Sequence, residues 1–180
     1  MKNFVCFLIA LASFSLNAQP RPHVKVPEEM SQLDFLIGTW DVHSKTINKK
    51  GEVAYESDFI MSFEKEFNGM MVLAKSGRYN ENNELSAGQY TWYFYDKQAG
   101  KFMDVNFDIV GNFEIKTGNF DNGKLMFAYP APKKGPDGVY RIWRKTMQDI
   151  QPDSFTWIWH YTKDEGKTWI KHWHTTFKRK

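Results

Sequence analysis

From Gly38 to the end of the chain, stretches of alternating apolar and polar residues follow one another about every ten residues. Turns rich in Asn, Asp and Gly separate them, as in Asp121-Asn122-Gly123 and Asp164-Glu165-Gly166. The pattern predicts strands at residues 38–48, 52–64, 69–79, 85–96, 101–109, 112–121, 124–130, 139–149, 154–162 and 167–178. A meander of this kind closes on itself or leaves two exposed edges. We therefore predict an all-β fold, a single antiparallel up-and-down β-barrel of about ten strands.

One short helix is expected before the first strand. Residues 28–37 can form a short helix that caps one end of the barrel, with an apolar side made of Met30, Leu33, Phe35, Leu36 and Ile37. No internal repeat, linker or low-complexity tract interrupts the chain, so residues 29–180 are predicted to form one domain. Aromatic residues make up 17% of the chain, more than a small helical bundle needs, and they suit strands around a lined cavity.

The N-terminus has the parts of a secretory signal peptide. Met1-Lys2-Asn3 precedes an apolar run from Phe4 to Leu16, and Ala18 offers a small residue for cleavage. We expect a signal peptide at 1–18, a proline-rich extended leader at 19–28, and export to the periplasm or the medium. The run is too short to span a bilayer, so no transmembrane segment is expected. A buried amphipathic N-terminal helix is the alternative interpretation.

Cysteine usage restricts the chemistry further. Cys6 is the only cysteine and lies inside the predicted signal peptide, where no lipobox precedes it. The mature chain is then expected to have no disulfide, no thiolate metal site and no cysteine nucleophile.

Charge and motifs exclude several function classes. The 24 basic and 21 acidic residues are scattered, which gives no electrostatic footprint for nucleic acid. There is no nucleophile elbow, phosphate-binding glycine loop, paired helical histidines or calcium loop. Any chemistry must therefore come from strand residues that converge in the barrel lumen.

The segment from Leu33 to Val42, with Gly38-Thr39-Trp40 at its centre, resembles the Gly-x-Trp signature of the calycin superfamily, which includes lipocalins, fatty-acid-binding proteins and nitrobindin-like haem proteins. The C-terminal half, with Ser154-Phe155-Thr156 and the ending Thr176 to Arg179, is similar to a bacterial family of exported lipocalin-like domains of unknown function. The resemblance covers about residues 30–180. It implies that Trp40 plugs the closed end of the barrel and that Arg179 or Lys178 packs over its indole.

Side-chain parity separates the histidines from the aromatic residues. On strand 154–162 the residues Phe155, Trp157, Trp159 and Tyr161 share one face, opposite His160. On the last strand Trp169, Lys171 and Trp173 share one face, opposite His172 and His174. In one interpretation the aromatics form the core and the histidines lie on the surface. In the other, a bulge turns His172 or His174 into the lumen as a general base.

We take His172, His174 and Tyr161 as candidate catalytic residues. The candidate substrate-binding residues combine rings with cations, which suits a sugar bearing an acidic group: Trp157, Trp159, Arg144, Lys171 and Tyr93. Asp104 and Asp108, four residues apart on one strand, are too far apart for a glycosidase pair and are interpreted as part of a solvated face.

Metal and cofactor sites are not expected. His172-x-His174 would put two imidazoles on one side of a strand, but a zinc site needs a third ligand, and His160 is the obvious candidate. Haem, which the nitrobindin-like relatives hold, would need one lumenal imidazole from the same pair. We predict neither group.

Two functional hypotheses remain, besides a barrel filled by its own side chains. The first is an exported barrel that acts on a small anionic carbohydrate, for example an unsaturated uronic-acid oligosaccharide, by cofactor-free acid–base chemistry of the lyase or dehydratase type. The second is a non-catalytic carrier of a small hydrophobic or amphipathic ligand. The expected partner is a small-molecule or oligosaccharide ligand, with the protein a monomer or a homodimer.

Overall fold

A computed structural model describes residues 25–180, except residues 80, 81, 83, 84 and 136. The predicted signal peptide at 1–18 and most of the predicted leader at 19–28 lie outside the described residues. Among those described, no helix is long and apolar enough to cross a membrane.

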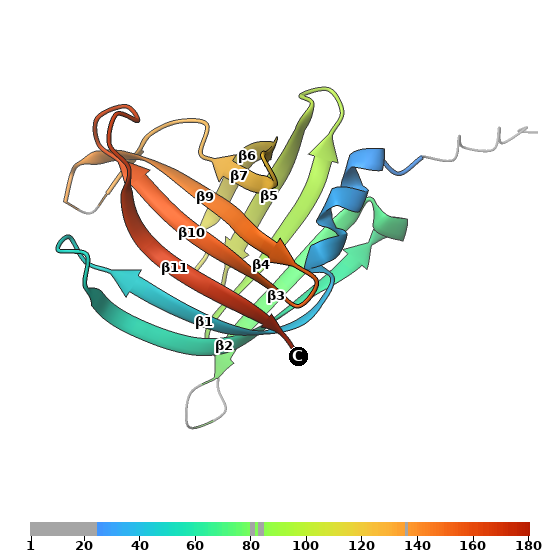
Figure 1. Ribbon diagram of the computed structural model, residues 1–180, viewed down its shortest axis with the longest axis horizontal. Coiled ribbons are helices and arrows are strands. Elements are labelled where there is room, and N and C mark those ends of the chain that lie inside the picture. Colours follow the sequence, from blue (N-terminus) through green and yellow to red (C-terminus); the bar gives the residue numbers. More distant parts are fainter. Residues whose placement is uncertain (1–24, 80–81, 83–84, 136) are drawn as a thin grey trace, which may run out of the picture.

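Ten long antiparallel strands close into a barrel (Figure 1). Each strand pairs with the next along the chain, and the last strand pairs with the first through the register Trp40 to Arg179, Val42 to Phe177 and Ser44 to Thr175. A two-residue strand, β8, pairs only with the start of β9. The strands are β1 Gly38–Ile47, β2 Val53–Glu66, β3 Met71–Tyr79, β4 Leu85–Asp96, β5 Lys101–Asp108, β6 Phe113–Asp121, β7 Lys124–Ala128, β8 Lys133–Lys134, β9 Tyr140–Gln151, β10 Ser154–Thr162 and β11 Ile170–Arg179. The predicted up-and-down barrel is confirmed.

A 3-10 helix, η1 (Glu28–Leu36), covers one end of the barrel, and a single 3-10 turn, η2 (Phe67–Gly69), joins β2 to β3. η1 buries Met30, Leu33 and Leu36 against the barrel core, while Phe35 and Ile37, the other two residues of the predicted apolar side, are partly buried against the same core. Figure 1 shows η1 in blue beside the ends of β3 and β4. No helix of the described residues covers the opposite end of the barrel.

At the closed end, Trp40 is fully buried, and its indole Nε1 donates a hydrogen bond of 2.7 Å to the Leu36 carbonyl oxygen. The Arg179 guanidinium lies 4.2 Å from the Trp40 ring centre and donates to the Ile37 carbonyl oxygen. Gly38 has a φ of +131°, and a Cβ there would lie 2.5 Å from an Arg179 nitrogen. The absence of a side chain at Gly38 therefore leaves room for Arg179, which connects the last strand to the start of the first.

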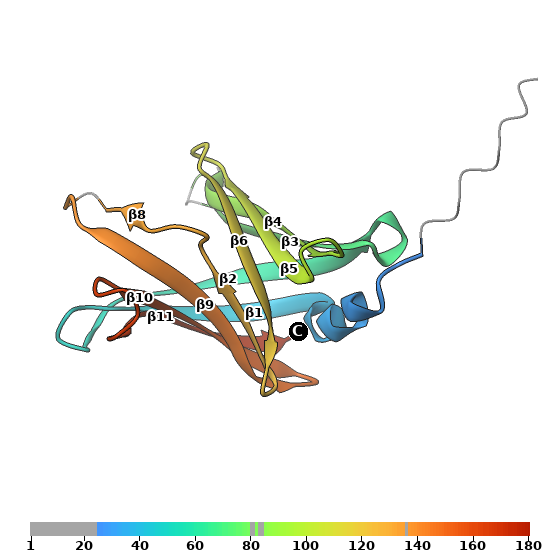
Figure 2. The same ribbon diagram turned by 90° about the horizontal axis from the view of Figure 1, so that it is seen from above.

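The interior changes from apolar to polar along the barrel axis. Phe63, Leu125, Phe127, Phe155 and Phe177 fill the half beneath Trp40 and η1. Toward the open end, polar and charged residues take many of the inward positions, and aromatic rings take others. Figure 2 shows β3 to β5 on one side of the barrel and β10, β11 and β1 on the other, so these two walls face each other across the polar half.

The expected orientation of β5 is wrong. Asp104 is 1% exposed and points into the barrel, whereas Phe107 and Ile109 are each 45% exposed on the outer face. The outward apolar residues lie beside other outward rings, because Phe107 contacts Trp92 of β4 and Phe113 of β6. Asp104 points inward because ammonium groups inside the barrel compensate its charge.

A bulge in β11 changes the parity of the last strand. Trp159 pairs with Trp173, but the next residue of β10, His160, pairs with Lys171, which leaves His172 as the extra residue. His172 and Trp173 consequently both line the lumen, while Lys171 and His174 do not.

Candidate functional site

The open half of the barrel contains two connected cavities. The mouth chamber, of about 790 Å³, lies at the uncovered end, and the deep chamber, of about 360 Å³, lies below it. Gln89, Asn106, Glu114, Trp159 and Trp173 line both, so they form one lumen. A lumen of this size suits a small ligand.

One wall of the mouth chamber is aromatic. Trp143 of β9 and Trp173 of β11 stack with ring centres 5.7 Å apart, and Trp159 of β10 meets Trp173 edge-on at the same distance. Tyr161 packs 5.0 Å from Trp143. These rings come from three neighbouring strands at the same level of the barrel, and they present flat apolar surfaces to the cavity.

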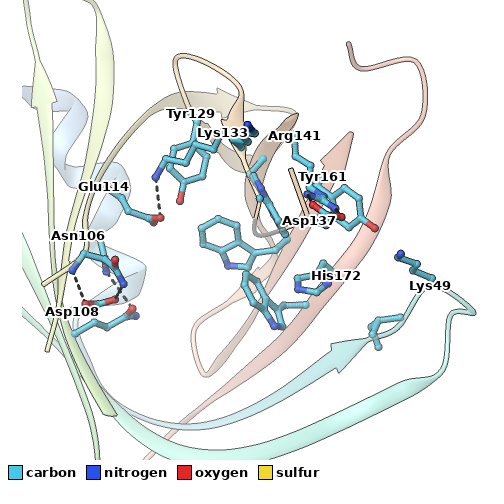
Figure 3. Close-up of a pocket in the computed structure, with 18 of the residues that line it drawn as sticks. Lys49, Asn106, Asp108, Glu114, Tyr129, Lys133, Asp137, Arg141, Tyr161 and His172 are labelled. Carbon is cyan, nitrogen blue, oxygen red and sulfur yellow. Dashed lines mark hydrogen bonds and ion pairs between the residues drawn. The ribbon is translucent and has the colours of Figure 1, made fainter. Parts of the chain in front are cut away.

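The opposite wall is polar. Figure 3 shows Asn106, Asp108 and Glu114 on the side of the cavity that faces Tyr161 and His172. The Asn106 amide donates to Gln89 Oε1 at 3.2 Å and to Thr91 Oγ1 at 2.9 Å, which fixes its orientation. Asp108 accepts two bonds from Asn112, and these hydrogen bonds lower its pKa. The wall therefore offers several fixed oxygen acceptors to a ligand.

His172 lies between aromatic rings at this mouth. Its ring centre is 4.3 Å from Trp173, 5.2 Å from Trp143 and 5.9 Å from Tyr161. Burial lowers its pKa and Arg141 lowers it further, although a hydrogen bond that the imidazole donates to the backbone of Ile47 acts in the opposite direction. The imidazole is accordingly neutral at pH 7 and able to accept a proton.

The deep chamber contains a buried ion cluster. Asp104 forms ion pairs through Oδ1 with Lys116 Nζ, at 3.0 Å, and through Oδ2 with Lys145 Nζ. Lys145 also donates to the Tyr93 hydroxyl at 2.8 Å. Glu114, nearer the mouth, pairs with Lys116 at 3.4 Å and with Lys133 at 3.1 Å.

Burial and the neighbouring charges together set the protonation of this cluster. Burial raises the pKa of Asp104, but the ammonium groups of Lys145 and Lys116 outweigh this, so the net shift is downward. Burial also lowers the pKa of Lys145 to about 8 and raises that of Tyr93 well above its ordinary value. At neutral pH the cluster therefore has an ionised aspartate, a neutral tyrosine and a lysine close to its titration point.

Cations outnumber carboxylates around the lumen. Lys49, Lys133, Lys134 and Arg141 line the mouth against Asp108, Glu114 and Asp137, and the deep chamber adds Lys116 and Lys145 against Asp104. Among the described residues, these six basic groups against four acidic groups leave two excess positive charges. An anionic ligand is therefore favoured over a neutral one of equal shape.

The structure brings together five of the eight predicted site residues. Tyr161 and His172 line the mouth chamber, Tyr93 and Trp157 line the deep chamber, and Trp159 lines both. Their roles remain predictions.

The other three lie outside the lumen. Arg144 stacks on Trp169, with its guanidinium 3.9 Å from the ring centre, because its neighbour Lys145 takes the inward position on β9. Lys171 and His174 face outward on either side of the β11 bulge. The expected carboxylate-binding role of Arg144 and Lys171 is thus not supported by their placement, and neither is a catalytic role for His174.

His172 and His174 do not share one side of the strand, contrary to the spacing argument, because the bulge reverses the parity between Lys171 and Trp173. Over the part of the chain that the structure describes, no three metal-ligating side chains cluster.

Sequence reasoning missed the lysines of the deep chamber. Lys145 alternates with Trp143 and Met147, and Lys116 lies on β6 beside Asp104 of β5. The sequence did offer one signal, because Lys145 lies two residues from Trp143 and therefore on the same face of the strand. Strand pairing was needed to show that Lys116, Lys145 and Asp104 compensate one another.

Comparisons with known proteins identify the fold but no family. No family model and no curated protein matches the chain. The solved structure of Rv2717c from M. tuberculosis is similar, with a TM-score of 0.56 and 11% identity over 87% of this chain and 99% of that one. A de novo designed fluorescence-activating β-barrel has a TM-score of 0.40 and 10% identity over 82% of this chain and 95% of its own. A protein of unknown function from Nostoc punctiforme has a TM-score of 0.25 and 10% identity over 86% and 100%. At 11% identity the likeness to Rv2717c shows a shared β-barrel fold alone.

Proposed function

We propose that the lumen binds a small anionic carbohydrate. The observation that carries this proposal is the two-sided mouth chamber, with Trp143, Trp159 and Trp173 on one wall and Asn106 and Glu114 on the other. Flat rings stack on the C–H faces of a sugar. Carboxylate oxygens accept hydrogen bonds from its hydroxyls, and amide groups can both accept and donate them. The excess of cations around the lumen favours a sugar that bears a carboxylate. An exported protein would meet such a ligand outside the cytoplasm, and export remains a prediction.

A second candidate function, acid–base elimination on the same ligand, is favoured by the position of His172 beside Tyr161. In such an elimination on a saturated uronate residue of the oligosaccharide, a base removes the proton from the carbon next to the carboxylate, and an acid protonates the hydroxyl on the following carbon, which leaves as water. The neutral His172 imidazole suits the first role and the Tyr161 hydroxyl suits the second. His174, on the outer face, serves as the natural control.

Binding is tested by titrating the protein with an unsaturated uronic-acid oligosaccharide while following tryptophan fluorescence. We expect Trp143→Ala to raise Kd by about tenfold or more, since a stacked ring contributes on the order of 1–3 kcal/mol. Trp169→Ala, on the outer face, is the matched control and should leave Kd unchanged. Equal binding by the Trp143→Ala variant would place the ligand elsewhere.

Turnover is read in the same samples from the ultraviolet absorbance of the conjugated double bond and from the loss of one water in the mass spectrum. His172→Gln should abolish turnover with little change in Kd, as for a group needed mainly in the transition state. His174→Gln should be as active as the wild type. If the wild type binds the oligosaccharide tightly without turnover, the elimination reaction is excluded and the protein acts as a carrier.

A further inference from the structure

The surroundings of Lys145 differ from those of an ordinary lysine, which keeps its ammonium group in water. Its side chain is 3% exposed, and its Nζ lies 4.4 Å from the ring centre of Trp157 and 2.8 Å from the Tyr93 hydroxyl. It lines the deep chamber, which opens into the mouth chamber through Asn106 and Trp159. A ligand that enters the lumen can therefore reach this amine.

Burial is the main reason that Lys145 loses its proton more easily than an ordinary lysine, and the neighbouring ammonium of Lys116 adds to the effect. Lys116 and Lys145 share the buried carboxylate of Asp104, while Glu114, which also pairs with Lys116, is 29% exposed. Loss of one proton leaves a neutral pair between Asp104 and Lys116, and a buried site favours that state. The other charged and titratable groups that act on Lys145 are Glu114 on β6 and the Tyr93 hydroxyl on β4, and Arg78 of β3 lines the same chamber.

Trp157 provides a second and independent indication of a ligand in the deep chamber. It is 6% exposed, and its indole Nε1 is a buried donor without a hydrogen-bond partner among the described residues. A buried donor is seldom left unpaired. An oxygen atom of a bound ligand would satisfy it, and a carbonyl oxygen would be polarised toward attack.

We propose that Lys145 is a nucleophile that condenses with an aldehyde or ketone group in the deep chamber and holds it as an imine. The Nζ lone pair attacks the carbonyl carbon, and the carbonyl oxygen leaves as water after it has taken up two protons. The amine supplies both, and when the resulting imine is protonated, Asp104 is its counter-ion. This inference rests on the proposed function only in that the ligand enters through the same lumen.

The free amine explains why Lys145 would react before the other lysines. With a pKa of about 8, it carries about 300-fold more neutral amine at pH 7 than an exposed lysine does. A planar aldehyde small enough for the chamber should therefore label Lys145 first.

The experiment uses salicylaldehyde as the probe, with borohydride to reduce the imine and peptide mapping to locate it. The wild type should gain the mass of one aldehyde less one oxygen atom, on Lys145, at least about tenfold faster than on any other lysine. Lys145→Met should lose this fast phase while keeping a compensated Asp104–Lys116 pair. A fast phase that maps to exposed lysines, or that persists in Lys145→Met, would overturn the inference.

Lys116→Met is the informative second variant. Without Lys116, Lys145 becomes the sole cation facing Asp104, so it should hold its proton more tightly. We expect labelling at pH 7 to slow by about tenfold and the pH midpoint of labelling to rise. Labelling that is unchanged in this variant would contradict the mechanism. If the uronic-acid oligosaccharide binds but Lys145 is not labelled, the imine alone fails; if labelling occurs without sugar binding, the proposed function alone fails.

Discussion

Single residues at the closed end hold the barrel together. Trp40 is buried, its indole is bonded to the Leu36 carbonyl, and Arg179 covers its ring. Arg179 also donates to the Phe35, Ile37 and Pro152 carbonyls, so one side chain ties η1, the β9–β10 turn and the last strand together. A partly buried cation–π contact with satisfied hydrogen bonds contributes more to stability than a fully exposed one.

Trp40→Ala should lower the free energy of unfolding by about 3–5 kcal/mol, because it leaves a large cavity and an unfilled acceptor. Urea unfolding followed by circular dichroism measures this change. Trp169→Ala, which removes an indole in contact with the outer face, should cost less than about 1 kcal/mol. A Trp40→Ala variant as stable as Trp169→Ala would show that the indole does not plug the barrel.

At the scale of elements, β5 has its charged face inside and its apolar face outside. Asp104 points inward because Lys116 of β6 and Lys145 of β9 compensate it, while Phe107 packs on its outward neighbours Trp92 and Phe113. Cross-strand aromatic pairs stabilise a sheet even when they lie on its exposed face. The orientation of β5 is thus set by its partners rather than by its own hydrophobicity.

Asp104→Ala should be far more destabilising than Phe107→Ser. Removing the carboxylate leaves two buried ammonium groups facing each other, and we expect a loss of about 3–5 kcal/mol. Phe107 is 45% exposed, and its replacement should cost about 1 kcal/mol. Denaturation midpoints of the two variants give the comparison, and the reverse order would mean that β5 is turned the other way.

For the molecule as a whole, the closed barrel couples its buried charges to pH. The pKa of Asp104 is lower in the folded protein than in the unfolded chain. The stability that this adds is present above the unfolded-state pKa and is lost as the pH falls through the folded-state pKa. The lowered pKa of Lys145 affects stability at alkaline pH. Between about pH 8 and the unfolded-state pKa of 10.5, the unfolded chain binds more protons than the folded protein. Stability should therefore rise with pH in that interval.

We expect the free energy of unfolding to increase by about 2 kcal/mol between pH 8 and pH 10, measured by urea unfolding at each pH. The raised pKa of Tyr93 reverses the trend above its ordinary value of 10, because the folded state then holds the extra proton. In Lys145→Met the increase should vanish. A wild-type curve that is flat or falls from pH 8 to pH 10 would mean that folding does not lower the pKa of Lys145.

The sequence by itself determined the strands, the capping helix and the closed end. Alternation and turn residues place each long strand to within a few residues, and Gly38-Thr39-Trp40 marks the plug, because local backbone preferences and a short motif carry that information. Only the tertiary structure decided which faces line the lumen. The β11 bulge that admits His172 arises from the pairing of β10 with β11, and the inward turn of Asp104 depends on lysines 12 and 41 residues away, Lys116 and Lys145. Side-chain alternation within one strand predicts neither feature, because a bulge and a compensating charge are properties of strand pairs and of the closed barrel.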